Sequence, residues 1–150
     1  MIAVLSGVVH ARSWYGGAGA GVGWDGEYCE MAVAPEIGYE FNEKWALGAK
    51  VKFESFEGEF FLSGDPYIRY NLWNNERVYV DLKLHADMSL DNLDAYNLVG
   101  FTPSLRYRLS DKWELKTDLG TVGARGSGPD WEPAILLSSI AVDAAVIFRF

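Results

Sequence analysis

Apolar and polar residues alternate along most of this chain, and the clearest case is its last stretch. From Ile140 to Phe150 every second residue is apolar, and the residues between are mostly small or polar, with Asp143 and Arg149 among them. Strict alternation is typical of a β-strand, because successive side chains point to opposite faces of the strand. We therefore predict a strand over 135–150 that ends on an aromatic residue.

The same alternation, interrupted by turn-forming residues, predicts eight strands in all. We expect them at about 14–24, 31–41, 45–56, 66–73, 77–90, 96–109, 113–124 and 135–150. Pro35 and Pro103 fall inside two of these strands. Since proline cannot donate a hydrogen bond to a neighbouring strand, we expect a β-bulge at each of them.

The connectors between the predicted strands are of two kinds, which alternate along the chain. Three are short, at 41–45, 73–77 and 109–113, and each places turn-formers, an acid and a base between apolar or aromatic flanks. The other four, around 25–30, 57–65, 91–95 and 125–134, are mostly longer and rich in glycine and acidic residues. Because antiparallel strands reverse direction at each connector, the short connectors should gather at one end of the fold and the longer ones at the other.

Assigning the residues of each strand to two faces separates apolar from charged side chains. In the strand over 77–90, for example, Val78, Val80, Leu82, Leu84, Ala86 and Met88 share one face. The opposite faces of the strands carry Glu36, Glu40, Lys50, Lys52, Glu54, Arg69, Asp81, Lys83, His85, Asp87, Arg106, Arg108, Glu114, Lys116, Asp118, Asp143 and Arg149. Apart from His85, these are eight acids and eight bases. If this face encloses a narrow lumen, we expect a balanced network of ion pairs, because an unpaired buried charge is costly.

Aromatic residues gather at the ends of the predicted strands. Most lie near the short connectors, and Trp24 and Phe53 lie near the other end. Amphipathic rings collect at lipid–water interfaces. We predict an aromatic girdle made of Trp14, Trp24, Trp45, Trp73, Tyr107 and Trp113.

The alternation that ends on Phe148 and Phe150 resembles the C-terminal assembly signal of bacterial outer-membrane β-barrels. Over roughly 14–150 the chain is similar to the small barrels of this family typified by outer membrane proteins A and X. The resemblance implies an all-β, eight-stranded antiparallel up-and-down transmembrane β-barrel that is inserted by the barrel-assembly machinery. It also implies periplasmic termini, extracellular acidic loops, and a role in envelope integrity, adhesion or surface interaction.

Composition agrees with this prediction. The 150 residues fit one domain, and 49% hydrophobic residues are too many for a disordered chain. No run of eighteen apolar residues exists, which excludes a helical membrane protein. Residues 2–11 resemble the end of a secretory signal peptide. We therefore predict the remnant of a signal peptide over 1–11 and one barrel domain over 12–150. A further short strand is the alternative interpretation of 2–11. Cys29 is the one cysteine, and no Cys/His cluster has zinc-site spacing, so we expect no cofactor.

The net charge of −8 is expected to lie in the longer loops. These hold ten acids (Asp25, Glu27, Glu30, Glu57, Glu59, Asp65, Asp91, Asp94, Asp130 and Glu132) against Arg125. Such a rim could share divalent cations with lipopolysaccharide phosphates or meet a surface partner, and its sign disfavours nucleic acid. We expect outer-membrane lipid and lipopolysaccharide as surroundings, and a monomer.

Three functions are compatible with this pattern. We expect a passive envelope or interaction protein without an open pore, since the side chains of an eight-stranded barrel fill its interior. A lipid A-modifying enzyme is the first alternative, but its candidates His85 and Ser89 lie four residues apart on one strand, roughly 13 Å, so we expect no enzyme. A soluble lipocalin-like barrel with apolar residues inside and charges outside is the second alternative.

Overall fold

The computed structural model describes residues 13–25, 28–56, 58–91, 97–136 and 144–150, and every regular element in them is a β-strand. The strands are β1 (Ser13–Asp25), β2 (Tyr28–Glu40), β3 (Trp45–Phe56), β4 (Glu59–Asn74), β5 (Val78–Ser89), β6 (Asn97–Arg108), β7 (Trp113–Asp118), β8 (Thr121–Ser127), β9 (Asp130–Leu136) and β10 (Ala144–Arg149). The predicted all-β class is confirmed. No helix in the described residues is long and apolar enough to cross a membrane.

Eight of these strands close into an antiparallel barrel. Hydrogen-bonded neighbours run β5–β4–β3–β2–β1–β10–β7–β6, and β6 pairs with β5 to complete the ring. β8 continues the line of β7 along β6, and β9 pairs with β8. The predicted eight-stranded barrel is thus confirmed; its seventh strand is divided into β7 and β8, and its eighth is described as β9 and β10, on either side of 137–143, which lie outside the described residues.

The division between β7 and β8 is a bulge opposite Pro103. Ser104 pairs with Asp118, but three positions back Phe101 pairs with Val122, so one extra residue is inserted in the stretch containing Leu119 and Gly120. Gly120 has a φ of +117°, which favours glycine. The bulge expected at Pro103 therefore lies in the strand that pairs with it.

The bulge expected at Pro35 is absent. Val33 pairs with Phe53 and Glu36 with Lys50, so the register between β2 and β3 is the same on both sides of the proline. Ala34 and Pro35 have no paired partner in β3, while Pro35 still pairs with Ala18 of β1. The sheet accommodates the proline by omitting two pairings on one side instead of inserting a residue.

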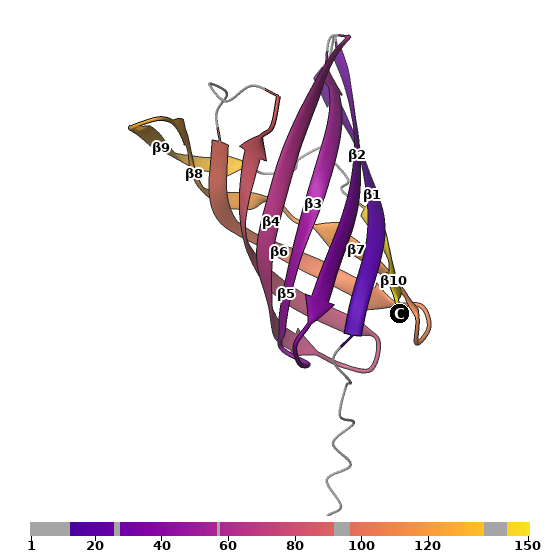
Figure 1. Cartoon of the computed structure of the whole chain (residues 1–150). Coiled ribbons are helices and arrows are strands. Elements are labelled where there is room, and N and C mark those ends of the chain that lie inside the picture. The colour runs from indigo at the N-terminus through magenta and orange to yellow at the C-terminus, as the bar shows by residue number, and fades with distance from the viewer. Residues whose placement is uncertain (1–12, 26–27, 57, 92–96, 137–143) are drawn as a thin grey trace, which may run out of the picture.

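The two ends of the barrel differ in a way that corrects the predicted loops. At the turn end, defined by the short turns at 41–44, 75–77 and 109–112, the connectors are as predicted. At the opposite end, the hairpin end, the stretches expected as loops at 57–65 and 125–134 are mostly strand. Gly58 and Gly128 adopt positive φ values of 84° and 59°, which permit tight turns there. Figure 1 shows β3 and β4 rising together, while the β8–β9 hairpin projects to the side.

Polar side chains are buried inside the barrel and apolar side chains are exposed outside it, the reverse of a soluble domain. Among the described residues, thirteen polar or charged ones are buried against eight hydrophobic ones, of which Tyr15, Ala46, Ala145 and Ile147 form one cluster. Large apolar side chains lie on the outside in register, in a row of cross-strand pairs from Trp14 through Tyr39, Leu47, Ile68, Leu84 and Phe101 to Val122; all are exposed except the half-buried Tyr39. The core of this protein is therefore a polar lumen, and its outer wall is apolar.

Candidate functional site

The lumen contains fifteen of the seventeen charged or titratable residues that the sequence assigns to it. Their side chains are buried or half-buried among the strands: Glu36, Glu40, Lys50, Lys52, Arg69, Asp81, Lys83, His85, Asp87, Arg106, Arg108, Glu114, Lys116, Asp118 and Arg149. Glu54 does not belong with them, since its side chain is exposed where β3 extends toward the hairpin end. Asp143 lies outside the described residues.

Asp65 is a lumenal residue that the sequence analysis misplaced. It was assigned to an acidic loop, yet its side chain is 1% exposed and contacts His85 and Lys52. The assignment was wrong because Gly64 and Pro66 flank it and suggest a turn. The alternation Ser63, Asp65, Tyr67 and Arg69 along the inward face of β4 was the signal that could have identified it.

An arginine cluster occupies the lumen near the turn end. Arg106 donates from Nε and Nη2 to Asp81 and from Nη1 to Glu114 at 2.8 Å. Arg149 donates to both carboxylate oxygens of Glu40, at 2.5 and 3.0 Å, and its Nη2 lies 2.9 Å from Glu114. Arg69 donates to Glu40 at 2.6 Å. Such forked pairs fix each guanidinium in one orientation, so residues from β2, β4, β5, β6, β7 and β10 are connected across the lumen.

Two tyrosines and two glycines build the middle of the lumen. Tyr15 pairs with Gly38, Gly38 with Gly48, and Gly48 with Tyr67 across four neighbouring strands. Each tyrosine ring lies over its glycine: a Cβ at Gly38 would come within 2.3 Å of the Tyr15 ring, and one at Gly48 within 2.5 Å of the Tyr67 ring. The two hydroxyl groups are 2.8 Å apart. The glycines therefore provide the room in which the tyrosines meet.

Lysines from opposite walls of the barrel share the carboxylates of this layer. Lys116 donates to both oxygens of Glu36, at 2.7 and 2.6 Å. Lys50 and Lys83 both donate to Asp118, at 2.9 and 2.6 Å. Each bond joins residues at least 35 positions apart in the chain, so these pairs tie distant strands together.

A histidine relay lies on the hairpin side of the lysines. His85 Nδ1 is 2.7 Å from Asp65, and Nε2 is 2.9 Å from the Thr102 hydroxyl, which is in turn 2.5 Å from Thr121. Lys52 pairs with Asp87 at the same level. Asp65, His85 and Thr102 are ordered like an acid, a base and a hydroxyl nucleophile. All three are buried, at most 6% exposed.

The enzyme candidates from the sequence do not meet. His85 bonds Asp65 and Thr102, whereas the Ser89 hydroxyl donates to Asp91 at 2.9 Å. A nucleophile and its base must lie within hydrogen-bond reach. Within the described residues, no group of three or more His, Cys, Asp and Glu side chains is arranged to hold a metal ion.

The described lumen carries nearly balanced charge. It holds seven acids (Glu36, Glu40, Asp65, Asp81, Asp87, Glu114 and Asp118) and eight bases (Lys50, Lys52, Arg69, Lys83, Arg106, Arg108, Lys116 and Arg149). A cavity of about 500 Å³ opens at the turn end, lined by Arg106, Arg108 and Arg149 with Glu40, Glu43, Glu76, Tyr79 and two asparagines. Beyond this mouth, side chains that bond across the barrel occupy the lumen.

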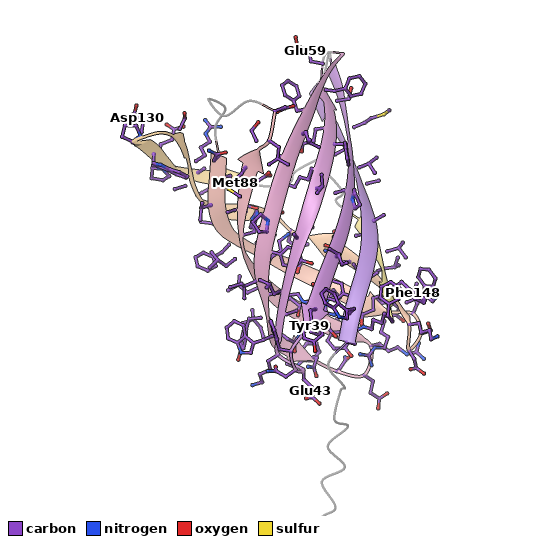
Figure 2. All side chains as sticks on the ribbon, in the orientation of Figure 1. Tyr39, Glu43, Glu59, Met88, Asp130 and Phe148 are labelled. Carbon is purple, nitrogen blue, oxygen red and sulfur yellow. The ribbon has the colours of Figure 1, made fainter. Side chains whose placement is uncertain are left out.

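Five of the six residues of the predicted girdle point outward near the turn end. Trp14, Trp45, Trp73, Tyr107 and Trp113 are all exposed by 41–55%; the side chain of Trp24 is outside the described set. Ring contacts join Trp113 to Phe148 at 4.8 Å and Phe148 to Phe150 at 5.3 Å, on the predicted assembly signal. In Figure 2, Tyr39 and Phe148 lie toward the same end of the barrel as Glu43.

Acidic residues lie at the hairpin end, although fewer than predicted can be placed. Glu59, Asp91, Asp130 and Glu132 are exposed there, and Arg125 lies 3.0 Å from Glu132. Glu59 and Asp130 mark the tips of different hairpins in Figure 2. The signal remnant over 1–11, Glu27, Glu57 and Asp94 lie outside the described residues, and the side chains of Asp25 and Glu30 are not described.

In comparisons with known proteins, no family model and no curated protein sequence matches this chain.

Proposed function

We propose that this chain is an integral outer-membrane β-barrel of a bacterium with a structural or surface-interaction role. The observation that carries the proposal is the inverted burial of the barrel. Charged side chains such as Asp81, Lys83 and Glu114 are buried inside, while apolar ones such as Ile37, Leu84 and Phe101 are exposed outside. A barrel that spans a bilayer has this polarity, since lipid requires an apolar outer face and a closed hydrogen-bonded wall.

The distribution of exposed charge supports a lipid-facing band. Exposed charged residues of the described chain lie in the turn-end turns (Glu43, Lys44, Glu76, Arg77, Asp111 and Lys112) or in the hairpin-end extensions (Glu54, Glu59, Asp91, Arg125, Asp130 and Glu132). Between these ends the outward positions are apolar, glycine, proline or threonine. A soluble ligand-binding barrel would expose charge at this level and bury the apolar face around its ligand, so the arrangement favours the membrane.

The lumen supports a passive role over a channel or an enzyme. Its ion pairs connect opposite walls, and the Asp65–His85–Thr102 relay in its described part is buried, with each member at most 6% exposed. We infer that the acidic hairpin end faces the cell exterior and the turn end the periplasm, as short turns do in this architecture. Exposed carboxylates on the projecting hairpins are then available to surface partners or divalent cations.

Two arginine substitutions test the membrane proposal. Leu84→Arg places a charge in the middle of the outer wall, and Leu109→Arg places one in a turn at the rim. In a bilayer the first should cost about 2–4 kcal/mol and the second about 0–1 kcal/mol. Heat-modifiable gel migration and urea unfolding in lipid vesicles measure the difference. Equal, small effects, or recovery of the wild-type chain in a soluble fraction without detergent, would refute the proposal.

A further inference from the structure

The outer wall of the barrel is hollowed near the turn end. This hollow, of about 550 Å³, is lined by Phe41, Asn42, Trp45, Ala46, Leu47 and Ile68. Trp45, Leu47 and Ile68 are exposed side chains on the outward face of β3 and β4, and Leu47 pairs with Ile68. The hollow is therefore an apolar recess, continuous with the apolar wall, that has one polar residue, Asn42, in its lining.

The turn beside the hollow has a fixed backbone. Asn42 Oδ1 accepts hydrogen bonds from the N–H groups of Lys44 and Trp45, at 2.9 and 3.0 Å. The N–H of Phe41 donates to the Trp45 carbonyl at 3.0 Å, and the N–H of Asn71 donates to the Lys44 carbonyl at 2.7 Å. These four bonds hold the base of the turn at a constant position relative to the aromatic lining of the hollow.

The acid and the base of this turn do not share the same surroundings. Glu43 lines the cavity at the mouth of the lumen, together with Glu76. Lys44 is exposed and does not line that cavity. The Glu43 carboxylate therefore borders the lumen, whereas Lys44 is exposed and its backbone N–H is bonded to Asn42, the polar residue in the lining of the outer hollow.

We propose that this hollow binds a phospholipid with an anionic headgroup from the leaflet that surrounds the short turns. Its acyl chain lies against Trp45, Leu47 and Ile68, and its phosphate meets Lys44 and the Asn42 amide. This inference rests on the proposed membrane function. A lysine at a membrane surface contributes about fivefold to the binding of an anionic lipid, and the apolar recess binds the acyl chain by burying its surface.

Native mass spectrometry of the full chain tests the site. The protein is reconstituted with equal amounts of phosphatidylglycerol and phosphatidylcholine, and the ratio of the two lipids retained is measured. We expect wild-type protein to retain phosphatidylglycerol about fivefold over phosphatidylcholine, and Lys44→Gln to lower this ratio to near one. Lys112→Gln is the matched control, because Lys112 occupies the same position in another turn and lies over the Phe148 ring at 5.9 Å; its ratio should stay that of wild type.

A second pair of variants tests the apolar part of the site. Ile68→Trp fills the hollow and should reduce retention of both lipids, whereas Leu84→Trp, at the position paired with Ile68 on the next strand, should not. Three results would refute the lipid site without affecting the proposal of membrane insertion. Wild-type protein could retain the two lipids equally, both lysine variants could lower the lipid ratio equally, or Ile68→Trp could retain as much lipid as the wild type. A chain that fails to insert into vesicles would instead refute the proposed function.

Discussion

Removing Arg106 should destabilise the barrel far more than removing an exposed arginine. The Arg106 guanidinium donates to Asp81 and Glu114, whose side chains are each 0% exposed. Arg106→Met keeps the length of the side chain but leaves two buried carboxylates without this cation. Because breaking a buried pair by removing one partner costs about 3–5 kcal/mol, we expect a loss of that size in the free energy of unfolding. Arg69 near Asp81, and Arg149 beside Glu114, limit the loss to this range.

The matched control is Arg125→Met. Arg125 also pairs with a carboxylate, that of Glu132, but the two side chains are 50% and 59% exposed. An exposed pair contributes about 0–1 kcal/mol, so this variant should unfold almost as the wild type does.

Urea unfolding of the refolded protein, followed by tryptophan fluorescence, measures both variants. A third variant combines Arg106→Met with Asp81→Asn. Its loss in the free energy of unfolding should be smaller than the sum of the losses of the two single variants, because Asp81→Asn removes one of the carboxylates that Arg106→Met leaves unpaired. If Arg106→Met loses no more stability than Arg125→Met, or if the double variant is strictly additive, the lumenal ion pairs do not stabilise the fold as argued.

Three further predictions follow from particular contacts. Gly38→Ala places a methyl group against the Tyr15 ring and should lower the free energy of unfolding by about 1–3 kcal/mol, whereas Gly21→Ala, whose nearest neighbour is Ala32 at 3.8 Å, should be nearly neutral in the same urea assay. Deleting Phe150, which is 77% exposed, should slow membrane assembly in a time course with the assembly machinery while leaving the unfolding midpoint of the assembled barrel unchanged; a normal insertion rate would show that the terminal aromatic is not a signal. Incubation with lipid A should leave its acyl chains unaltered by mass spectrometry, and a His85→Ala-sensitive change in those chains would show that the chain is an enzyme.

Much of the architecture could be predicted from local patterns alone. Period-two alternation predicted the eight strands, the last of which is described only over 130–136 and 144–149, because the faces of a strand differ in environment at every residue. The short turns were equally readable, since Asn42, Asn75 and Ser110 each accept hydrogen bonds from backbone N–H groups of their turn, as turn-formers do. The extended hairpins were missed where glycine and proline, at Gly64 and Pro133, resemble loop residues but lie within strands.

The sequence predicts which charged residues face the lumen, but it does not predict which of them pair with one another. Alternation shows that Lys116 and Glu36 face the same side of their strands, yet 80 residues separate them, and only the closure of the ring brings them together. The same holds for the Asp65–His85–Thr102 relay, whose members come from β4, β5 and β6.

The sequence by itself determined that this chain forms amphipathic strands with charges on one face and apolar residues on the other, because that pattern is a local property of each segment. Which face is inside was decided only by the tertiary structure, since both kinds of barrel share the same alternation. The lumen of an eight-stranded ring is narrow, so its long charged side chains reach partners on the opposite wall, and the paired charges can then be buried while the apolar face is left outside.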